Sequence, residues 1–202
     1  MNPRRLTLIL LPIIPVIIGL ILFLVASSQN QDIRQHASST NQPIITISTS
    51  PSSPKANQPV TINLSLNTTT KSISGLELKN FLIIPDSNLS FANTPILTPI
   101  NIPELDVFHS SVQQNSPTNN QITAITHILT LKDLNTPYST HDQLVPFATI
   151  NFTPTATGNI LLQFDVNNTI ITEYQGGADN ILGSLNNLTL TVTNPDQDDN
   201  DN

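Results

Sequence analysis

Residues 144–166 have the sequence LVPFATINFTPTATGNILLQFDV, in which two alternating segments flank a loop. Apolar residues occupy every second position of 148–152 and again of 160–166. This period of two is typical of a β-strand with one face in the core. Between the segments, Pro154 and Gly158 interrupt strand structure and allow a reversal of the chain. The stretch therefore predicts an antiparallel hairpin that serves as scaffold, since it contains no cysteine, histidine or arginine.

The same period recurs along most of the chain. Its clearest instance is PVTINLSLN, residues 59–67, where aliphatic residues alternate with Thr, Asn and Ser. In ISGLELKNFLIIP, residues 73–85, Leu76 and Leu78 share a face that Asn80 would break, so we expect a β-bulge there that turns Phe81 inward. Further strands are predicted from Ile44 (IITIST) and at 122–131 (ITAITHILTL), 168–174 (NTIITEY) and 187–193 (NLTLTVT).

Residues 85–120 are cut by prolines into short pieces. We expect short strands in NLSF (88–91) and PILTPI (95–100), and a turn or brief helical piece in NIPELDVFH (101–109). Apart from the N-terminal leader, no window keeps a helical period. About nine short strands separated by turn signals predict an all-β domain, a nine-stranded jelly-roll β-sandwich over residues 44–193.

The apolar N-terminal segment predicts the cellular location of the protein. Residues 6–26, LTLILLPIIPVIIGLILFLVA, carry no charge and as a helix are long enough to cross a bilayer. Arg4 and Arg5 precede this run, so the positive-inside rule keeps residues 1–5 cytoplasmic and exports the remainder. We expect a single-pass cell-membrane protein with an extracellular C-terminal domain, joined to its lipid-embedded anchor by a polar linker at residues 27–43. A cleaved signal peptide is the alternative, with small residues at 25–28 as the cleavage site.

The amino-acid composition argues against nucleic-acid binding and against cysteine-based sites. The chain has 7 Lys and Arg against 14 Asp and Glu, which gives a net charge of −7. A surface with so few cations is a poor partner for phosphate groups, so nucleic-acid binding is not expected. The absence of cysteine excludes disulfides and thiolate sites.

The order of these pieces resembles the cohesin domain, a nine-stranded jelly roll similar in outline to cellulose-binding modules. The resemblance covers roughly residues 44–193. It is carried by IIPDSNLSF (83–91), at the place of the family's aromatic-Asp-Pro turn, and by LVPFATINFTPTATGNILLQF (144–164). The aromatic-Asp-Pro is here Ile84-Pro85-Asp86. The resemblance implies a bacterial, membrane-anchored interaction module that binds a dockerin-like partner domain through one sheet face, although no residue motif identifies that face.

No catalytic, cofactor-binding or metal-binding residue is predicted. None of the four histidines, His36, His109, His127 and His141, has ligand spacing, and His127 is expected to be a satisfied inward or rim residue. Glu104 and Asp106 could form a glycosidase pair, but acids at i and i+2 in a loop are more simply solvated. We expect a binding protein and no enzyme.

The C-terminal residues 194–202 are predicted to form an acidic disordered tail. Asp196, Asp198 and Asn200 match the first three ligand positions of a calcium loop, but the glycine and the bidentate glutamate are missing. Weak calcium binding at this tail is the residual possibility, and no other cofactor is expected.

A carbohydrate-binding module of the same fold is the alternative function, with a glycan as partner. Sugar rings stack on exposed Trp or Tyr, and the chain has no Trp and only Tyr138 and Tyr174. Six N-x-[ST] sequences arise by chance in Asn- and Thr-rich strands, and we interpret them as accidental. They begin at Asn63, Asn67, Asn88, Asn151, Asn167 and Asn187.

Overall fold

The structure, a computed structural model, describes residues 41–115, 122–176 and 179–195. The predicted anchor, most of the linker, His36 and the acidic residues of the tail lie outside these ranges. The described residues form ten strands: β1 (Ile44–Ser50), β2 (Val60–Asn67), β3 (Ile73–Pro85), β4 (Ile96–Pro99), β5 (Leu105–Asn115), β6 (Ile122–Leu131), β7 (Val145–Phe152), β8 (Gly158–Gln163), β9 (Thr169–Glu173) and β10 (Leu188–Val192).

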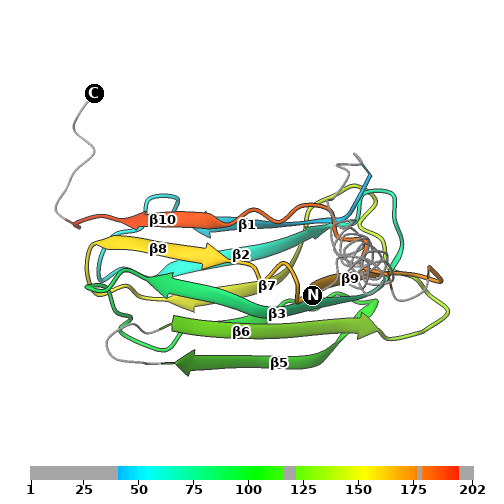
Figure 1. Cartoon of the computed structure of the whole chain (residues 1–202), viewed down its shortest axis with the longest axis horizontal. Coiled ribbons are helices and arrows are strands. Elements are labelled where there is room, and N and C mark those ends of the chain that lie inside the picture. Colours follow the sequence, from blue (N-terminus) through cyan, green and yellow to red (C-terminus); the bar gives the residue numbers. More distant parts are fainter. Residues whose placement is uncertain (1–40, 116–121, 177–178, 196–202) are drawn as a thin grey trace, which may run out of the picture. The chain divides into compact units, whose positions relative to one another are not determined.

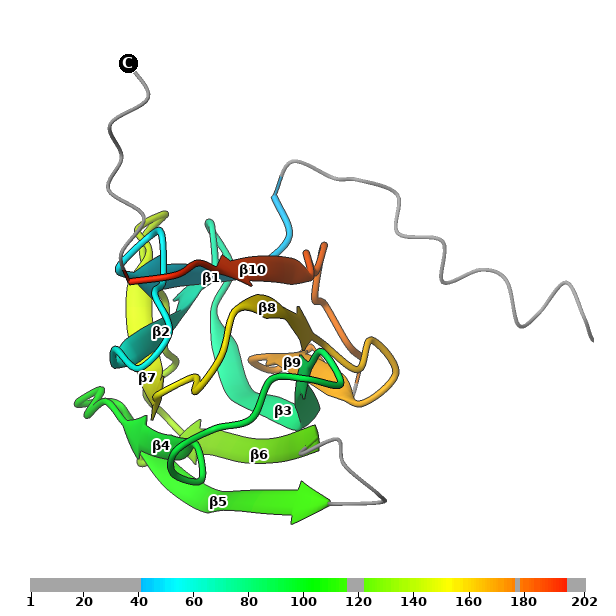
Figure 2. The ribbon, with the colours of Figure 1, turned by 90° about the vertical axis from the view of Figure 1, so that its left-hand side faces the viewer.

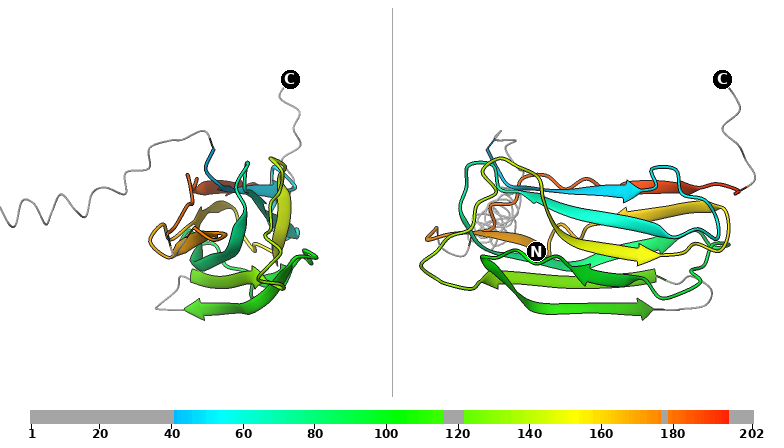
Figure 3. Two further views of the ribbon diagram at one scale, coloured as in Figure 1. Left: turned by 90° about the vertical axis from the view of Figure 1, so that its right-hand side faces the viewer. Right: turned by 180° about the vertical axis from the view of Figure 1, so that it is seen from behind.

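The strands form two antiparallel sheets packed face to face (Figures 1 and 2). One sheet has four strands in the order β1-β2-β7-β4. The other has six, in the order β10-β8-β3-β6-β5, with β9 paired to the first half of β3. Figure 1 shows the six-stranded sheet in front, and the view from behind in Figure 3 brings β1, β2 and β7 forward. The predicted all-β sandwich is confirmed.

The core lies between the sheets and is built from the inward half of each alternating strand. In β2 the residues Ile62, Leu64 and Leu66 are fully buried while their polar neighbours are partly exposed. From the opposite sheet, Phe81 stacks at a tilt on Phe164 with ring centroids 5.0 Å apart. Burial of apolar surface at about 25 cal/mol per Å² makes this layer the main source of the domain's stability.

The predicted hairpin at 144–166 is wrong, although both of its strands exist. β7 pairs with β2 and β4, whereas β8 pairs with β3 and β10, so the two strands lie in different sheets. The loop between them, residues 153–157, connects the two sheets. Each strand has one buried face both in a hairpin within one sheet and when the two strands lie in different sheets. The period of two therefore does not predict which strand pairs with which. β8 also ends at Gln163, and Val166 is exposed.

Two further expectations for the proline-rich middle are corrected. NIPELDVFH begins with a turn, but from Leu105 it enters β5 and has no helical piece. NLSF forms no strand: Phe91 makes a single bridge to Pro154. The expected strand in PILTPI is present as β4. Burial explains the first error, because β5 is an edge strand with most of its side chains in solvent and so lacks apolar alternation.

The predicted bulge in β3 is confirmed. The register with β6 shifts between Leu78 and Phe81, and Asn80 adopts a left-handed backbone with φ of 55°. Both Leu78 and Phe81 are fully buried as a result. Asparagine tolerates this conformation better than other residues with a Cβ.

We expect Asn80→Val to lower the free energy of unfolding by about 1–2 kcal/mol, because a β-branched residue is strained at positive φ. Asn80→Gly is the matched control and should stay within about 0.5 kcal/mol of the wild type, since glycine adopts this conformation without strain. Urea unfolding followed by circular dichroism measures both variants. Equal destabilisation by valine and glycine would show that the Asn80 side chain, and not its backbone, matters.

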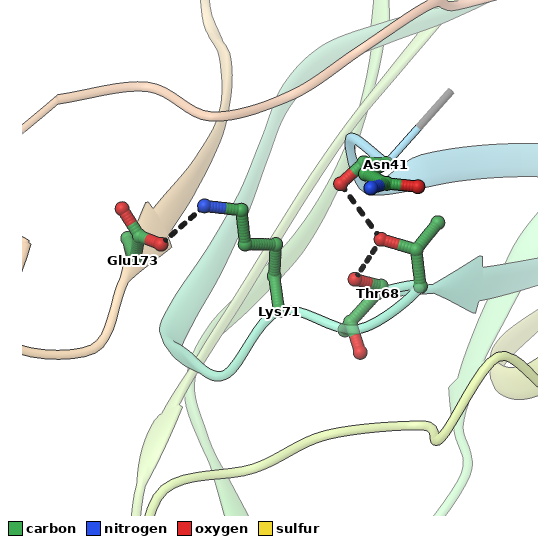
Figure 4. A network of polar contacts seen from close by, with 5 residues as sticks. Asn41, Thr68, Lys71 and Glu173 are labelled. Carbon is green, nitrogen blue, oxygen red and sulfur yellow. Dashed lines mark hydrogen bonds and ion pairs between the residues drawn. The ribbon is translucent and has the colours of Figure 1, made fainter. Parts of the chain in front are cut away.

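The sandwich has two distinct ends. At the entry end, the backbone of Pro43 accepts a hydrogen bond from Gly183 at 2.7 Å, and the hydroxyl of Thr69 donates to the carbonyl of Asn41 at 2.8 Å (Figure 4). Lys71 and Glu173 form an ion pair of 2.8 Å at the same end. The exit end is where β3 finishes and β10 leads to the C-terminus. The first described residues are thus fixed at the end opposite Val192, the last residue of β10.

Candidate functional site

The outer face of the four-stranded sheet is mainly polar on its interior strands β2 and β7, with Pro146 exposed beside Ser65 and Ile96 of the edge strand β4 exposed beside Asn151. On β2 it presents Thr61, Asn63 and Ser65, and on β7 it presents Thr149 and Asn151. The Thr61 hydroxyl donates to the Asn151 side chain across the strands at 2.7 Å. This is the pattern expected of an antiparallel sheet with water on one side.

The outer face of the six-stranded sheet is apolar near the exit end. Leu82 of β3 lies opposite Ala124 of β6, and Ile84 lies opposite Leu161 of β8. Ile122 follows on β6, beside Ile84 and on the same face as Ala124. Directly paired residues point to the same side of a sheet, so these five side chains are contiguous. All are partly exposed, and we call them the apolar patch.

Polar side chains border the apolar patch on both flanks. Gln113 of β5 lies beside Ala124, Gln163 of β8 lies beside Leu82, and Thr189 of β10 lies beside Leu161. An apolar centre with a polar rim is the anatomy of a protein-binding surface.

One feature of the sequence indicates the apolar patch, although it interrupts the alternation used to predict the strands. After the bulge, β3 continues as four consecutive apolar residues, 81–84, instead of alternating. Phe81 and Ile83 face the core, so Leu82 and Ile84 are left on the outer side. A continuous apolar run is typical of a strand covered on both faces, and within the described residues nothing covers the outer one.

The histidines do not form a site. His109 and His141 are exposed and belong to separate elements. His127 is inward, as predicted, but it is not satisfied: it is fully buried, and neither ring nitrogen has a hydrogen-bond partner in the described chain. Its ring stacks parallel on Phe147 with centroids 6.0 Å apart. Burial lowers the pKa of His127 from 6.5 to about 4, so the ring is neutral at pH 7.

The structure separates the two carboxylates of the glycosidase interpretation. Glu104 lines a groove with Ile100, Pro103 and Tyr138, whereas Asp106 borders a different groove and lies 3.7 Å from the Lys132 ammonium. The two acids therefore do not face each other across one cleft, as a glycosidase requires.

The two tyrosines do not provide a sugar platform. Tyr138 is buried, and Tyr174 is partly buried and packed against the core. Burial, and to a lesser degree the negative charge of Glu104, raises the pKa of the Tyr138 hydroxyl above its ordinary value. Among the described Phe and Tyr residues, only Phe108 of β5 is strongly exposed, at 75%, next to a register shift.

Within the described ranges, no three His, Asp or Glu side chains are placed to hold a metal ion. Residues 41–195, where described, also include no apolar helix of membrane-spanning length.

The sequence matches no family model and no curated protein. Among solved structures, it is similar to a cohesin module of a family 33 glycoside hydrolase from Clostridium perfringens, with 10% identity, a TM-score of 0.46, and coverage of 76% of this chain and 98% of that one. It is also similar to the cohesin CaCohA2 of Clostridium acetobutylicum (14% identity, TM-score 0.48, coverage 76% and 92%). A third is the third ScaC cohesin of Acetivibrio cellulolyticus, solved with the ScaB dockerin (17%, 0.47, 75% and 99%). At these values the likeness by itself assigns no partner to the chain.

Proposed function

We propose that the domain is a non-catalytic interaction module that binds a partner protein domain through the apolar patch. The observation that carries this proposal is the contrast between the two outer faces. The centre of the β2–β7 face is built from Thr, Asn and Ser, with Pro146 and Ile96 toward its margins, whereas β3, β6 and β8 present contiguous Leu and Ile side chains. Partly exposed aliphatic side chains gain free energy when a partner removes them from water, at about 25 cal/mol per Å².

The chemistry of the patch favours a protein over a glycan. Aliphatic side chains pack against the apolar side chains of another domain, and the Gln and Thr rim can hydrogen-bond its backbone. A sugar-binding face needs an aromatic ring as platform, and the patch has none. The resemblance of the sequence to cohesins supports a dockerin-like domain as the partner.

The position of the patch suits presentation at a cell surface. The described chain enters at the end held by Asn41 and Thr69, while the patch lies toward the exit end, where Pro85 pairs with Ile160. We propose that residues 6–26 anchor the chain in the bacterial cell membrane, with the sandwich outside. The described chain thus enters the sandwich at the end away from the apolar patch and leaves the patch uncovered.

Binding to protein domains and binding to glycans are compared to test the class of partner. The full chain in mild detergent is titrated with a panel of dockerin-like domains and, in parallel, applied to a glycan array. We expect saturable binding of at least one domain, with no glycan retained. Retention of a polysaccharide with no domain bound would contradict the proposal and move the chain to the carbohydrate-binding class.

A further inference from the structure

The outer backbone edge of β5 is a second surface, distinct from the sheet face on which Gln113 borders the apolar patch. β5 is the last strand of the six-stranded sheet and has 11 residues. Figures 1 and 2 show its free edge along one margin of the sandwich, and Figure 3 shows the same margin open from behind. Such an edge presents a row of unpaired backbone N–H and C=O groups, which can template another strand.

The other outer strands are short or bridged, whereas none of the described strands pairs with the outer edge of β5. β4 has 4 residues and ends at Pro99, and β10 has 5 residues. β1 is bridged at Ile45 to Leu185. These are the usual ways in which natural sheets limit edge pairing, together with charged residues and prolines. From His109 to Asn115, β5 has no proline, lysine, arginine or acidic residue and no register shift.

We propose that β5 pairs with β5 of a second copy of this chain. A two-fold axis at Val112 places Val112 opposite itself, Ser111 opposite Gln113 and Ser110 opposite Gln114. Every residue of the run from His109 to Asn115 then meets an uncharged partner. This matters because the chain is acidic, with a net charge of −7, so two copies repel each other over most of their surface.

The acidic residue of β5 is kept out of the paired segment. Asp106 lies before the register shift between Val107 and His109 and is paired with Lys132. Phe108 and Val107, which are 75% and 45% exposed, stand beside the end of the segment and add apolar surface that a second copy can cover. The edge is thus extended, uncharged and flanked by apolar side chains, which is the composition that favours strand addition.

Pairing of this kind joins two six-stranded sheets into one continuous sheet. Their two apolar patches then lie on a common face, and this consequence rests on the proposed function. A bivalent partner would be held by avidity without any new contact. The pairing itself is independent of partner binding, because it is measured on the chain alone.

Single cysteines test the pairing, because the chain has none of its own. The full chain is purified in mild detergent with Cys in turn at positions 110 to 114 and oxidised. Across a two-fold axis at Val112, opposite Cα atoms are about 4.5–5.5 Å apart, within disulfide range. The two copies of residue 110 are offset by about 13 Å along the strands and cannot be bridged. We expect a maximum of covalent dimer for Val112→Cys.

Thr191→Cys on β10, the opposite edge of the same sheet, is the matched control and should give little dimer. The pair Ser111→Lys and Gln113→Lys places like charges opposite each other across the axis and should reduce crosslinking of Val112→Cys at least about 5-fold. Without any cysteine, the same lysine pair should turn the dimer into a monomer in sedimentation velocity. Equal yields from Val112→Cys and Thr191→Cys, or a dimer unaffected by the two lysines, would overturn the proposal.

Discussion

Leu82→Glu is expected to weaken binding of the partner domain at least about 100-fold. Leu82 lies on β3, the middle strand of the apolar patch, between Ala124 and the rim residue Gln163. A few well-packed apolar side chains carry most of the binding free energy of an interface, about 2–4 kcal/mol each, and 1.4 kcal/mol corresponds to a factor of ten in affinity. Glutamate would also place an unpaired charge against an apolar partner surface, which adds a desolvation cost.

Thr149→Glu is the matched control for this prediction. Thr149 is also partly exposed, faces outward and lies in an interior strand, but in the opposite sheet, where Asn63 is its neighbour. Titration calorimetry with the best-binding dockerin-like domain should give an affinity within about 2-fold of the wild type for Thr149→Glu. Thermal unfolding of both variants checks that each is folded. Equal losses in the two variants would indicate that the patch is not the binding surface.

His127 is expected to make the domain strongly sensitive to acid. Its pKa is 6.5 in the unfolded chain and about 4 in the folded one, because the buried ring loses the hydration that stabilises its charged form. Between these values the unfolded state binds more protons than the folded state, so stability falls as pH falls from about 6.5 to about 4. A shift of this size corresponds to a loss of about 3 kcal/mol between pH 7 and pH 4.

His127→Leu should remove this part of the pH dependence. Its neighbours across the strands are Leu78 and Ser110, and its stacking partner is Phe147, and none of these three carries a charge that could compensate an added proton. We also expect the leucine variant to be at least as stable as the wild type at pH 7, since both ring nitrogens lack a hydrogen-bond partner in the described chain.

Urea unfolding at several pH values measures the effect as the difference between wild type and variant, which cancels the shared carboxylates. His141→Asn is the control, because His141 is exposed and its φ of 52° suits asparagine. This control should keep the pH dependence of the wild type. If His127→Leu does so too, His127 is not the group that titrates.

The sequence predicted strands well wherever one face of the strand is buried. β3 and β6 coincide with the stretches 73–85 and 122–131, and the bulge at Asn80 followed from one polar residue out of phase. β5 was not predicted because apolar alternation depends on a buried face. Most of its described side chains are exposed, and its sequence has no apolar alternation. The alternation of apolar residues could not predict which strands pair. The two strands that flank TPTATGN each bury one face whether they lie in the same sheet or in different sheets.

The candidate site followed from the sequence only in part. The resemblance to cohesins implied a binding face without identifying which sheet carries it. That choice depends on which strands are neighbours: Leu82, Ala124 and Leu161 are far apart in the chain, and only the register of β3 with β6 and β8 brings them together. Conversely, Glu104 and Asp106 are close in sequence and border different grooves.

Methyl NMR of the full chain, with Ile, Leu and Thr labelled, tests the central claim most directly. Spectra are recorded with and without the dockerin-like domain that binds best. We expect the methyl signals of Leu82, Ile84, Ile122 and Leu161 to shift on binding, while those of Thr61 and Thr149 on the opposite face stay in place. Shifts at the two threonines with none at the four aliphatic residues would contradict the assignment of the binding face.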